Sequence, residues 1–280
     1  MMKIIKNVWL IPLLLLQVAC SDGRSSRNDS SVQPDATVPE GYTLVFSDEF
    51  DQKESGLPDP TKWYYDEGAK GWGNNELQRY IPGFLGNDTC AIVENGELKI
   101  IAKQVGDAVY SIRMNSRESW KYGYFEARLK LPKGRGTWPA FWMMPDKEYT
   151  WPLDGEIDIM EHVGYDPCKV YSTIHTEAYN HRKGTQKSGS TVVDDPFDTF
   201  HIYAVEWTPE YIRGFVDGNS HFEFVNGKNG DKSSWPFDEP FYLKLNLAWG
   251  GDWGGQEGVD PSALPATYVI DYVRVYQKKE

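Results

Sequence analysis

Short strand-like segments between residues 41 and 280 restrict this chain to a β-rich fold. They carry alternating, β-branched or aromatic residues, and Gly, Pro, Asn and Asp separate them. No long stretch combines helical periodicity with helix caps. The pattern predicts an all-β chain, folded as a two-sheet antiparallel β-sandwich of the jelly-roll type. The expected strands are residues 44–50, 97–102, 124–131, 156–163, 170–175, 201–207, 211–216, 221–225, 242–248 and 268–276.

Two of these segments allow finer predictions. The strand 211–216 ends at Asp217-Gly218, a dipeptide that is typical of a tight hairpin turn. In the last strand the side chains are expected to alternate, with Val269, Asp271, Val273 and Val275 on one face and Ile270, Tyr272, Arg274 and Tyr276 on the other.

A large sandwich can also curve, and one sheet then offers a concave face that suits a linear polymer.

The amino terminus resembles a bacterial lipoprotein signal. Lys3 and Lys6 precede an apolar run over residues 8–16, and Ala19 precedes Cys20. The run is too short to span a bilayer as a helix, so it indicates a secretory signal. We expect residues 1–19 to be a signal peptide and Cys20 to carry lipid at the outer membrane. Plain secretion without lipid is the alternative.

The segment that follows is polar and rich in Ser, up to residue 40. Because so little apolar surface cannot drive folding, residues 20–40 are expected to be the lipidated Cys and a flexible linker, and residues 41–280 a single domain. With Cys20 lipidated, Cys90 and Cys168 remain. Export permits a disulfide between them, but we expect two separate buried thiols.

Charge and aromatic content narrow the classes of ligand. The net charge is −12, which argues against nucleic acid, because phosphates need a basic footprint, and against a sulfated polysaccharide. The 11 Trp, 17 Tyr and 12 Phe indicate either a large β core or a surface that receives flat apolar faces such as sugar rings. We therefore expect a neutral ligand, and a chain that acts as a monomer.

The most informative stretch is residues 151–164, WPLDGEIDIMEHVG. In a regular strand Glu156 and Asp158 share one face, whereas Glu161, at an odd offset, points to the other. One extra residue near Ile159-Met160, a β-bulge, turns Glu161 back to the acidic face. The spacing therefore predicts a bulged strand with an acidic front and an apolar back.

Two such glutamates can carry out glycoside cleavage. With the bulge, the two carboxyl groups are expected to lie about 5–7 Å apart, at ~3.3 Å rise per residue. Retaining glycosidases need a separation of ~5–5.5 Å, and inverting ones need ~6.5–9.5 Å. Crowded like charges raise the pKa of at least one acid, which leaves a protonated acid beside an ionised base. The alternatives are a solvated acidic face and a divalent-metal site, although the sequence has no HExxH motif or spaced Cys/His set.

The run GEIDIMEHVG resembles the active-site signature of glycoside hydrolase family 16. The resemblance covers residues 41–277 and implies a concanavalin A-like jelly roll with a concave cleft, so that residues 41–280 form the catalytic domain. Residues 109–119 depart from the Thr-Ser-x-Arg form that is commoner in the family. The segments that resemble the laminarinase-like and mixed-linkage β-glucanase branch are residues 71–80, 122–145, 172–181, 200–218, 243–255 and 268–277.

The resemblance also implies roles for individual residues. Glu156 corresponds to the nucleophile and Glu161 to the general acid/base, with Asp158 positioning the nucleophile and His175 near the acid/base. Core packing is the alternative for each Trp; Trp138 and Trp142 face the cleft if Phe141 points into the core. The implied sugar-binding residues are Asn74, Glu76, Arg113, Trp138, Trp142, Trp151 and Trp253.

The family resemblance implies no cofactor for catalysis but a structural Ca²⁺ on the convex side. The matching ligands are the carbonyls of Glu49 and Gly96 and the carboxylate of Asp271, which are oxygen donors of the kind that Ca²⁺ prefers. A salt bridge to Asp271 is the alternative.

The sequence thus predicts a retaining endo-β-glucanase that cleaves internal β-1,3 or mixed β-1,3/1,4 glucan bonds by double displacement. One alternative is a hydrolase of the same fold that acts on agar or carrageenan, and GWGNNELQ at residues 71–78 argues against it. The other is a non-catalytic, glycan-binding surface lipoprotein, and the presence of all three acids argues against it.

Overall fold

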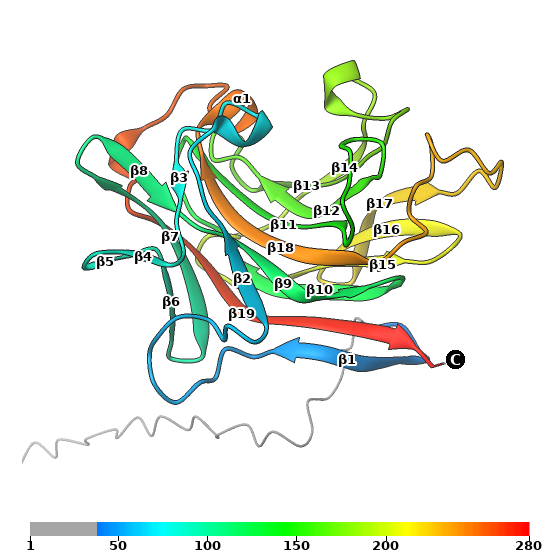
Figure 1. The fold of residues 1–280 in the computed structure, drawn as a ribbon, viewed down its shortest axis with the longest axis horizontal. Helices are drawn as coiled ribbons and strands as arrows, with labels where there is room; N and C mark the ends of the chain where they lie inside the picture. Colours follow the sequence, from blue (N-terminus) through cyan, green and yellow to red (C-terminus); the bar gives the residue numbers. More distant parts are fainter. Residues whose placement is uncertain (1–37, 280) are drawn as a thin grey trace, which may run out of the picture. The chain divides into compact units, whose positions relative to one another are not determined.

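A computed structural model describes residues 38–279, so the predicted signal peptide, Cys20 and most of the linker lie outside the described residues. This part of the chain forms two large β-sheets and one small hairpin (Figure 1). Its helical segments are the short α1 (Gly251–Gly254) and 3-10 turns at Gly71–Gly73, His181–Lys183 and Pro261–Ala263. The predicted all-β class is confirmed. No helix within residues 38–279 has the length and apolar character to cross a membrane.

The seven-stranded sheet holds the predicted carboxylate strand. All of its neighbouring strands are antiparallel, and they bow along their length (Figure 1). The order across the sheet is β14 (Lys187–Val192), β13 (Lys169–His175), β12 (Glu156–His162), β11 (Thr137–Pro145), β18 (Phe241–Trp249), β9 (Arg113–Trp120) and β2 (Trp63–Asp66).

The second sheet has ten strands. Its order is β17 (Asn219–Val225), β16 (Tyr211–Val216), β15 (His201–Trp207), β10 (Gly123–Lys130), β19 (Ala266–Lys278), β7 (Glu97–Val105), β8 (Ala108–Ser111) and β3 (Arg79–Tyr80), while β1 (Tyr42–Asp48) pairs with β19 and β6 (Ala91–Glu94) with β7. The short β3–β8 pair is parallel. A separate hairpin joins β4 (Phe84–Leu85) and β5 (Asp88–Thr89).

The main core lies between the two large sheets. Phe141 and Leu245 enter it from the seven-stranded sheet, and Phe125, Leu129 and Val273 from the ten-stranded one; all five are fully buried. Burial of each side chain of this size contributes about 1.5–3 kcal/mol. This shared core ties the site-bearing sheet to its support.

All ten expected strands are present, with ends that differ by a few residues. The predicted hairpin between β16 and β17 is confirmed, since Asp217 and Gly218 have left-handed φ values of 47° and 76°. Cys90 and Cys168 are separate thiols as expected, but only Cys90 is buried, and burial raises its pKa to about 11; Cys168 is half-buried.

The strict alternation expected for the last strand is wrong. Tyr272 pairs with Arg128 whereas Ile270 pairs with the next residue, Leu129, so Asp271 is an extra residue in β19. This bulge brings Ile270 to the core face, together with Val273 and Val275. The two halves of β19 therefore have opposite phases.

Candidate active site

Strand β12 contains the predicted bulge. On the β13 side Asp158 pairs with Thr173 and Glu161 with Tyr171, so three residue steps on β12 span two on β13. Ile159 has no partner in either neighbouring ladder. The extra residue returns Glu161 to the face of Asp158, as the spacing predicted. The apolar back of the strand, formed by Ile157, Ile159 and Met160, lies in the core.

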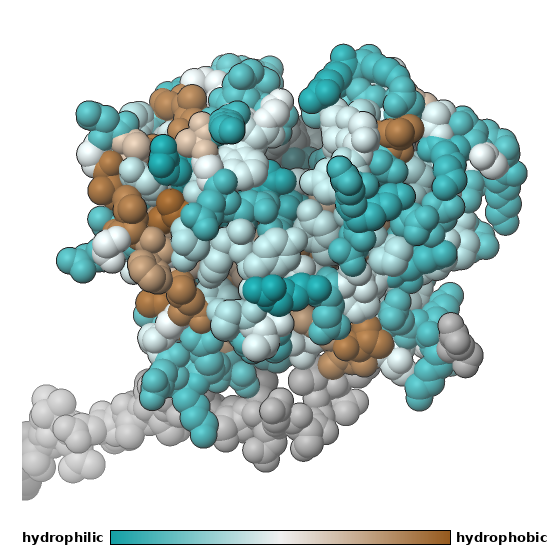
Figure 2. Space-filling model, in the orientation of Figure 1, coloured by the Kyte–Doolittle hydropathy of each residue, from teal (hydrophilic) through white to brown (hydrophobic). Residues whose placement is uncertain are grey.

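The three acids line a cleft in two halves that share Glu156 and Glu161. Figure 2 shows the surface hollowed between the part around α1 and the part around β14. One half includes Trp72, Asn74, Glu76, Arg113, Trp142, Tyr149 and Trp151, and the other includes Tyr171, Thr173, His175, Gln186, Ser188, Asp252 and Trp253. Every residue predicted to bind substrate therefore lies on the cleft.

Strand β11 supplies the cleft floor. Phe141 is fully buried in the core, so Trp138 and Trp142 point to the opposite face, as expected. Nε1 of Trp138 donates to Oε1 of Glu161 over 3.0 Å, and Nε1 of Trp142 donates to Oδ1 of Asn246 over 2.7 Å. The indole of Trp138 thus fixes the orientation of the Glu161 carboxyl group.

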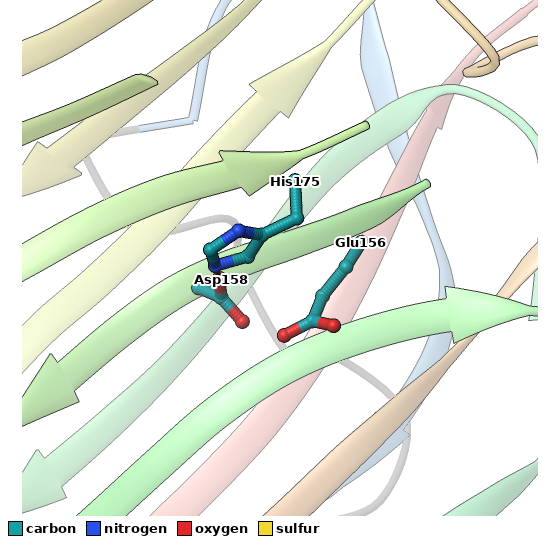
Figure 3. A group of neighbouring side chains, drawn as sticks. All are labelled: Glu156, Asp158 and His175. Carbon is teal, nitrogen blue, oxygen red and sulfur yellow. Dashed lines mark ion pairs between the residues drawn. The ribbon is translucent and has the colours of Figure 1, made fainter. Parts of the chain in front are cut away.

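Glu156 is held at the other end of the strand. Nε1 of Trp151 donates to its Oε2 over 2.5 Å, and His175 lies directly opposite it on β13. Nε2 of His175 is 3.5 Å from Oδ2 of Asp158 (Figure 3). The resemblance placed His175 near Glu161; the β12–β13 register pairs it with Glu156, and it lines the cleft half that also includes Glu161.

The environments of the acids set their protonation. Desolvation raises the pKa of Glu161 to about 8; the nearby Glu156 charge acts in the same direction, and the Trp138 hydrogen bond opposes it. Burial, with the charges of Glu156 and Glu161, raises the pKa of Asp158 well above its ordinary value. Burial lowers the pKa of His175, although the Glu156 charge opposes this. At neutral pH the site therefore contains a protonated Glu161 and a neutral imidazole, and the shift of Asp158 favours its protonated form.

Glu156, Asp158 and His175 also form the one group among residues 38–279 whose ligand atoms lie close enough to hold a metal ion, within 4.8 Å of one another (Figure 3). Metal ligation requires a deprotonated carboxylate. The raised pKa of Asp158 favours its protonated form, so a cation would compete with a proton at this group.

In the cleft half that includes Arg113, the cleft surface is supported by a group of charged side chains. The Arg113 guanidinium lies 4.9 Å from the Trp72 ring and 4.8 Å from the Trp142 ring, and its Nε is 3.0 Å from Oδ2 of Asp66. Nζ of Lys244 reaches the same Asp66 oxygen over 3.0 Å. Burial, aided by the Arg113 charge, lowers the pKa of Lys244 to about 7.

Glu76 is fixed by its own loop. Its Oε2 accepts from Nε2 of Gln78 over 2.6 Å and from the Tyr80 hydroxyl over 3.1 Å, and burial raises its pKa. The carbonyl of Asn74 accepts from the backbone N–H of Asp252 over 2.7 Å, which ties this loop to α1. The loop thus presents polar side chains of fixed orientation to the cleft.

In the other half, the Trp253 ring packs edge-on against two rings, 5.6 Å from Trp138 and 5.1 Å from Tyr171. Tyr171 was not predicted, although it shares the strand phase of His175. His181 and Arg182 were also missed; their side chains lie 4.9 Å and 4.5 Å from the Trp151 ring. They belong to a turn after β13, where no strand phase indicates direction.

The three predicted calcium ligands meet at one place in the fold. Strand β1 pairs with β19 up to Asp48–Val273, and β7 pairs with it from Leu98–Ile270, so Glu49 and Gly96 lie beside the Asp271 bulge. Oδ2 of Asp271 accepts from Nη1 of Arg128 over 2.7 Å. The carboxylate thus has the salt bridge that was the alternative, and a cation must compete with that guanidinium.

Known proteins resemble this chain closely. The family model described as Glycosyl hydrolases family 16 matches residues 84–274. A β-glucanase of Rhodothermus marinus is 49% identical, over 95% of this chain and 93% of that protein. The structure of the laminarinase from Rhodothermus marinus has a TM-score of 0.80 at 51% identity and covers 85% of this chain and 98% of that one. A non-specific endo-β-1,3(4)-glucanase, co-crystallised with 1,3-β-D-cellotriosyl-glucose, has a TM-score of 0.80 at 44% identity, over 86% and 96%.

Proposed function

Because this chain belongs to glycosyl hydrolases family 16, we propose that Glu156 and Glu161 carry out its glycosidic cleavage by double displacement. The chain is an endo-β-glucanase of β-1,3 or mixed-linkage β-1,3/1,4 glucans. Glu161, protonated at neutral pH, gives its proton to the leaving sugar oxygen while Glu156 attacks the anomeric carbon. Water then releases the glycosyl-enzyme intermediate, with Glu161 acting as the base.

Asp158 supports the nucleophile. Its raised pKa favours its protonated form, and a hydrogen bond to Glu156 contributes to that shift. Asp158 and the Trp151 indole then both donate to the carboxylate of Glu156, which orients its attacking oxygen.

The observation that carries this proposal is the β12 bulge, because it places both glutamates on one cleft face. The cleft continues on either side of the acids, and this extension supports cleavage inside a chain rather than at its end. Since one chain supplies both halves of the cleft, we propose that it acts as a monomer. Light scattering, which measures the molar mass in solution, tests this.

The deciding experiment is NMR of the first product formed from laminarin and from barley glucan. A product of retained anomeric configuration is expected, and an inverted product contradicts double displacement. Glu156→Gln should lose at least about 10³-fold in kcat, whereas Glu223→Gln, on the exposed face of β17, should keep normal turnover. Near-normal turnover of Glu156→Gln contradicts the assignment, and the product profiles decide the preferred linkage.

We also propose that Cys20, outside the described residues, anchors the protein by lipid to the outer membrane. The sequence before it, with two Lys, an apolar run and a small residue, supports this proposal. Fractionation should find the wild type with outer membranes and Cys20→Ala in the soluble fraction. A Cys20→Ala protein that stays with membranes contradicts lipid anchoring.

A further inference from the structure

Two strand irregularities face each other across the sandwich. The first is the β12 bulge, in which Ile159 has no ladder partner. The second lies in β17, where Phe222 pairs with Gly214 but Ser220 pairs with the next residue, Phe215, so that His221 is the extra residue. A bulge redirects the side chains and peptide groups around it, so both need support from outside their own ladder.

Ser172 of β13 connects the two bulges. Its Oγ donates to the carbonyl of Ile159 over 2.7 Å and lies 3.0 Å from Nε2 of His221. The hydroxyl has one hydrogen, and the Ile159 carbonyl takes it, so Nε2 of His221 must be the donor in the second bond. The Ser172 side chain is 1% exposed, so water does not replace either bond.

Gly214 of β16 makes room for this bridge. A Cβ atom at Gly214 would lie 2.5 Å from Oγ of Ser172, closer than real Cβ atoms approach. Gly189 of β14 has a similar position, where a Cβ atom would lie 2.5 Å from the His221 carbonyl. The close approach of these strands allows a single hydroxyl to reach from one sheet to the other.

We propose that Ser172 and His221 are positioning residues that hold the β12 bulge and thereby aim Glu161 at the scissile bond. The proposal rests on the function proposed above, in which Glu161 is the general acid/base. Glu161 follows Ile159 by two residues, so a rotated Ile159 peptide displaces its carboxyl group. A displacement of about 1 Å costs roughly 10²-fold in rate even when it originates away from the reacting atoms.

The test compares Ser172→Ala with Ser116→Ala. Ser116 is also buried in the seven-stranded sheet, and its hydroxyl also supports an irregular pairing, since it bonds the Glu118 carbonyl and the Leu243 N–H beside the β18–β9 register shift. We expect Ser172→Ala to lose about 10–100-fold in kcat/KM on laminarin, with a shifted alkaline limb of the pH–rate profile. Ser116→Ala should lower the Tm but keep both rate and profile.

Substrate chemistry separates positioning of the acid from general damage. A dinitrophenyl β-laminaribioside has a leaving group that needs no proton, so Ser172→Ala should lose less than about 3-fold in kcat/KM on it. Equal losses on both substrates, or no loss on laminarin, overturn the proposal.

His221 gives a second test, which also applies if Ser172→Ala does not fold. His221→Phe removes the donor to Ser172 and should lower kcat/KM on laminarin about 3–10-fold, whereas His221→Gln, which restores an N–H, should recover most of it. Equal activity of the two variants overturns the proposal. Glu161→Ala is measured alongside: if it remains active, the proposed function fails, and if it alone is inactive, only the positioning role fails.

Discussion

Nε1 of Trp138 donates to Oε1 of Glu161 over 3.0 Å, and this hydrogen bond opposes the desolvation that raises the pKa of this carboxyl group to about 8. The indole thus keeps the pKa of the acid lower than burial alone would set it. The same Trp138 also packs against Trp253 and forms part of the cleft floor. Trp138 therefore contributes both to the cleft surface that receives the substrate and to the pKa of Glu161.

We predict that Trp138→Phe moves the alkaline limb of kcat/KM to higher pH. The acid works in its protonated form, and activity falls as the pH rises through the pKa of Glu161. Without the indole donor this pKa rises, so the limb follows it upward, while the loss of the bond lowers the maximal rate about 10-fold. The pH–rate profile on laminarin checks this, with Trp253→Phe, which has no bond to the acid, as the control. A limb that stays in place or moves down contradicts the prediction.

Insertion of one Ala between Ile159 and Met160 should abolish activity. The bulge already takes up one extra residue, so a second one shifts the rest of β12 by one position, and Glu161 turns toward the apolar core while Met160 turns into the cleft. Loss of a general acid lowers the rate about 10²–10⁴-fold, and the buried charge also lowers the Tm.

The substitution Ile159→Val keeps the bulge and serves as the control for this insertion. It should cost only about 0.5–1.5 kcal/mol of stability and leave the rate unchanged. An insertion variant with wild-type turnover contradicts the role of the strand phase at Glu161.

The β12 bulge could be predicted from the sequence because the alternative is costly. A regular strand would point Glu161 into the core, and an uncompensated buried carboxylate is strongly unfavourable. The Asp271 bulge in β19 could not be predicted in this way. Ile270 and Tyr272 are both apolar, so either phase of the strand buries apolar side chains, and the register with β10 decides between them.

The charged support of the cleft also could not be predicted. From the sequence alone, a lysine in a strand such as Lys244 is expected to face solvent, yet its side chain is 1% exposed. Its burial depends on Asp66 from β2 and on the short hydrogen bond to Asn115 from β9, residues far away in sequence. Likewise β11 was not among the expected strands, although Trp138 and Trp142 were expected to share a face; it is a central strand that contains Pro139 and Pro145, and proline is rare in such strands.

Lys244→Met should stabilise the protein most at acidic pH. Burial lowers the pKa of Lys244 to about 7, whereas the unfolded chain holds this proton up to about pH 10.4. Between these two pH values unfolding takes up a proton, so the free energy of unfolding of the wild type rises with pH. Below about pH 7 Lys244 is charged in the folded state as well, and the buried charge then destabilises the folded state fully.

We therefore expect Lys244→Met to gain about 1–4 kcal/mol near pH 6, since Arg113 still pairs with Asp66, and the gain to shrink toward pH 9. Thermal unfolding at several pH values measures this. Lys99→Met, which breaks a more exposed pair with Glu94, should show no such trend. A gain that grows with pH contradicts the prediction.

Calcium is predicted to bind beside Asp271 in competition with Arg128. The carbonyls of Glu49 and Gly96 and the Asp271 carboxylate are suitable oxygen donors, but Oδ2 of Asp271 already accepts from Arg128. An ion that binds only the folded state adds about 2.7 kcal/mol at a concentration 100-fold above its Kd. We therefore expect Ca²⁺ to raise the Tm and a chelator to reverse the rise. Arg128→Gln, which removes the competing cation, should bind Ca²⁺ more tightly, and Asp271→Asn should abolish the response. A Tm that ignores Ca²⁺ in both wild type and Arg128→Gln excludes this site, and in that case the Arg128–Asp271 pair alone balances the charge.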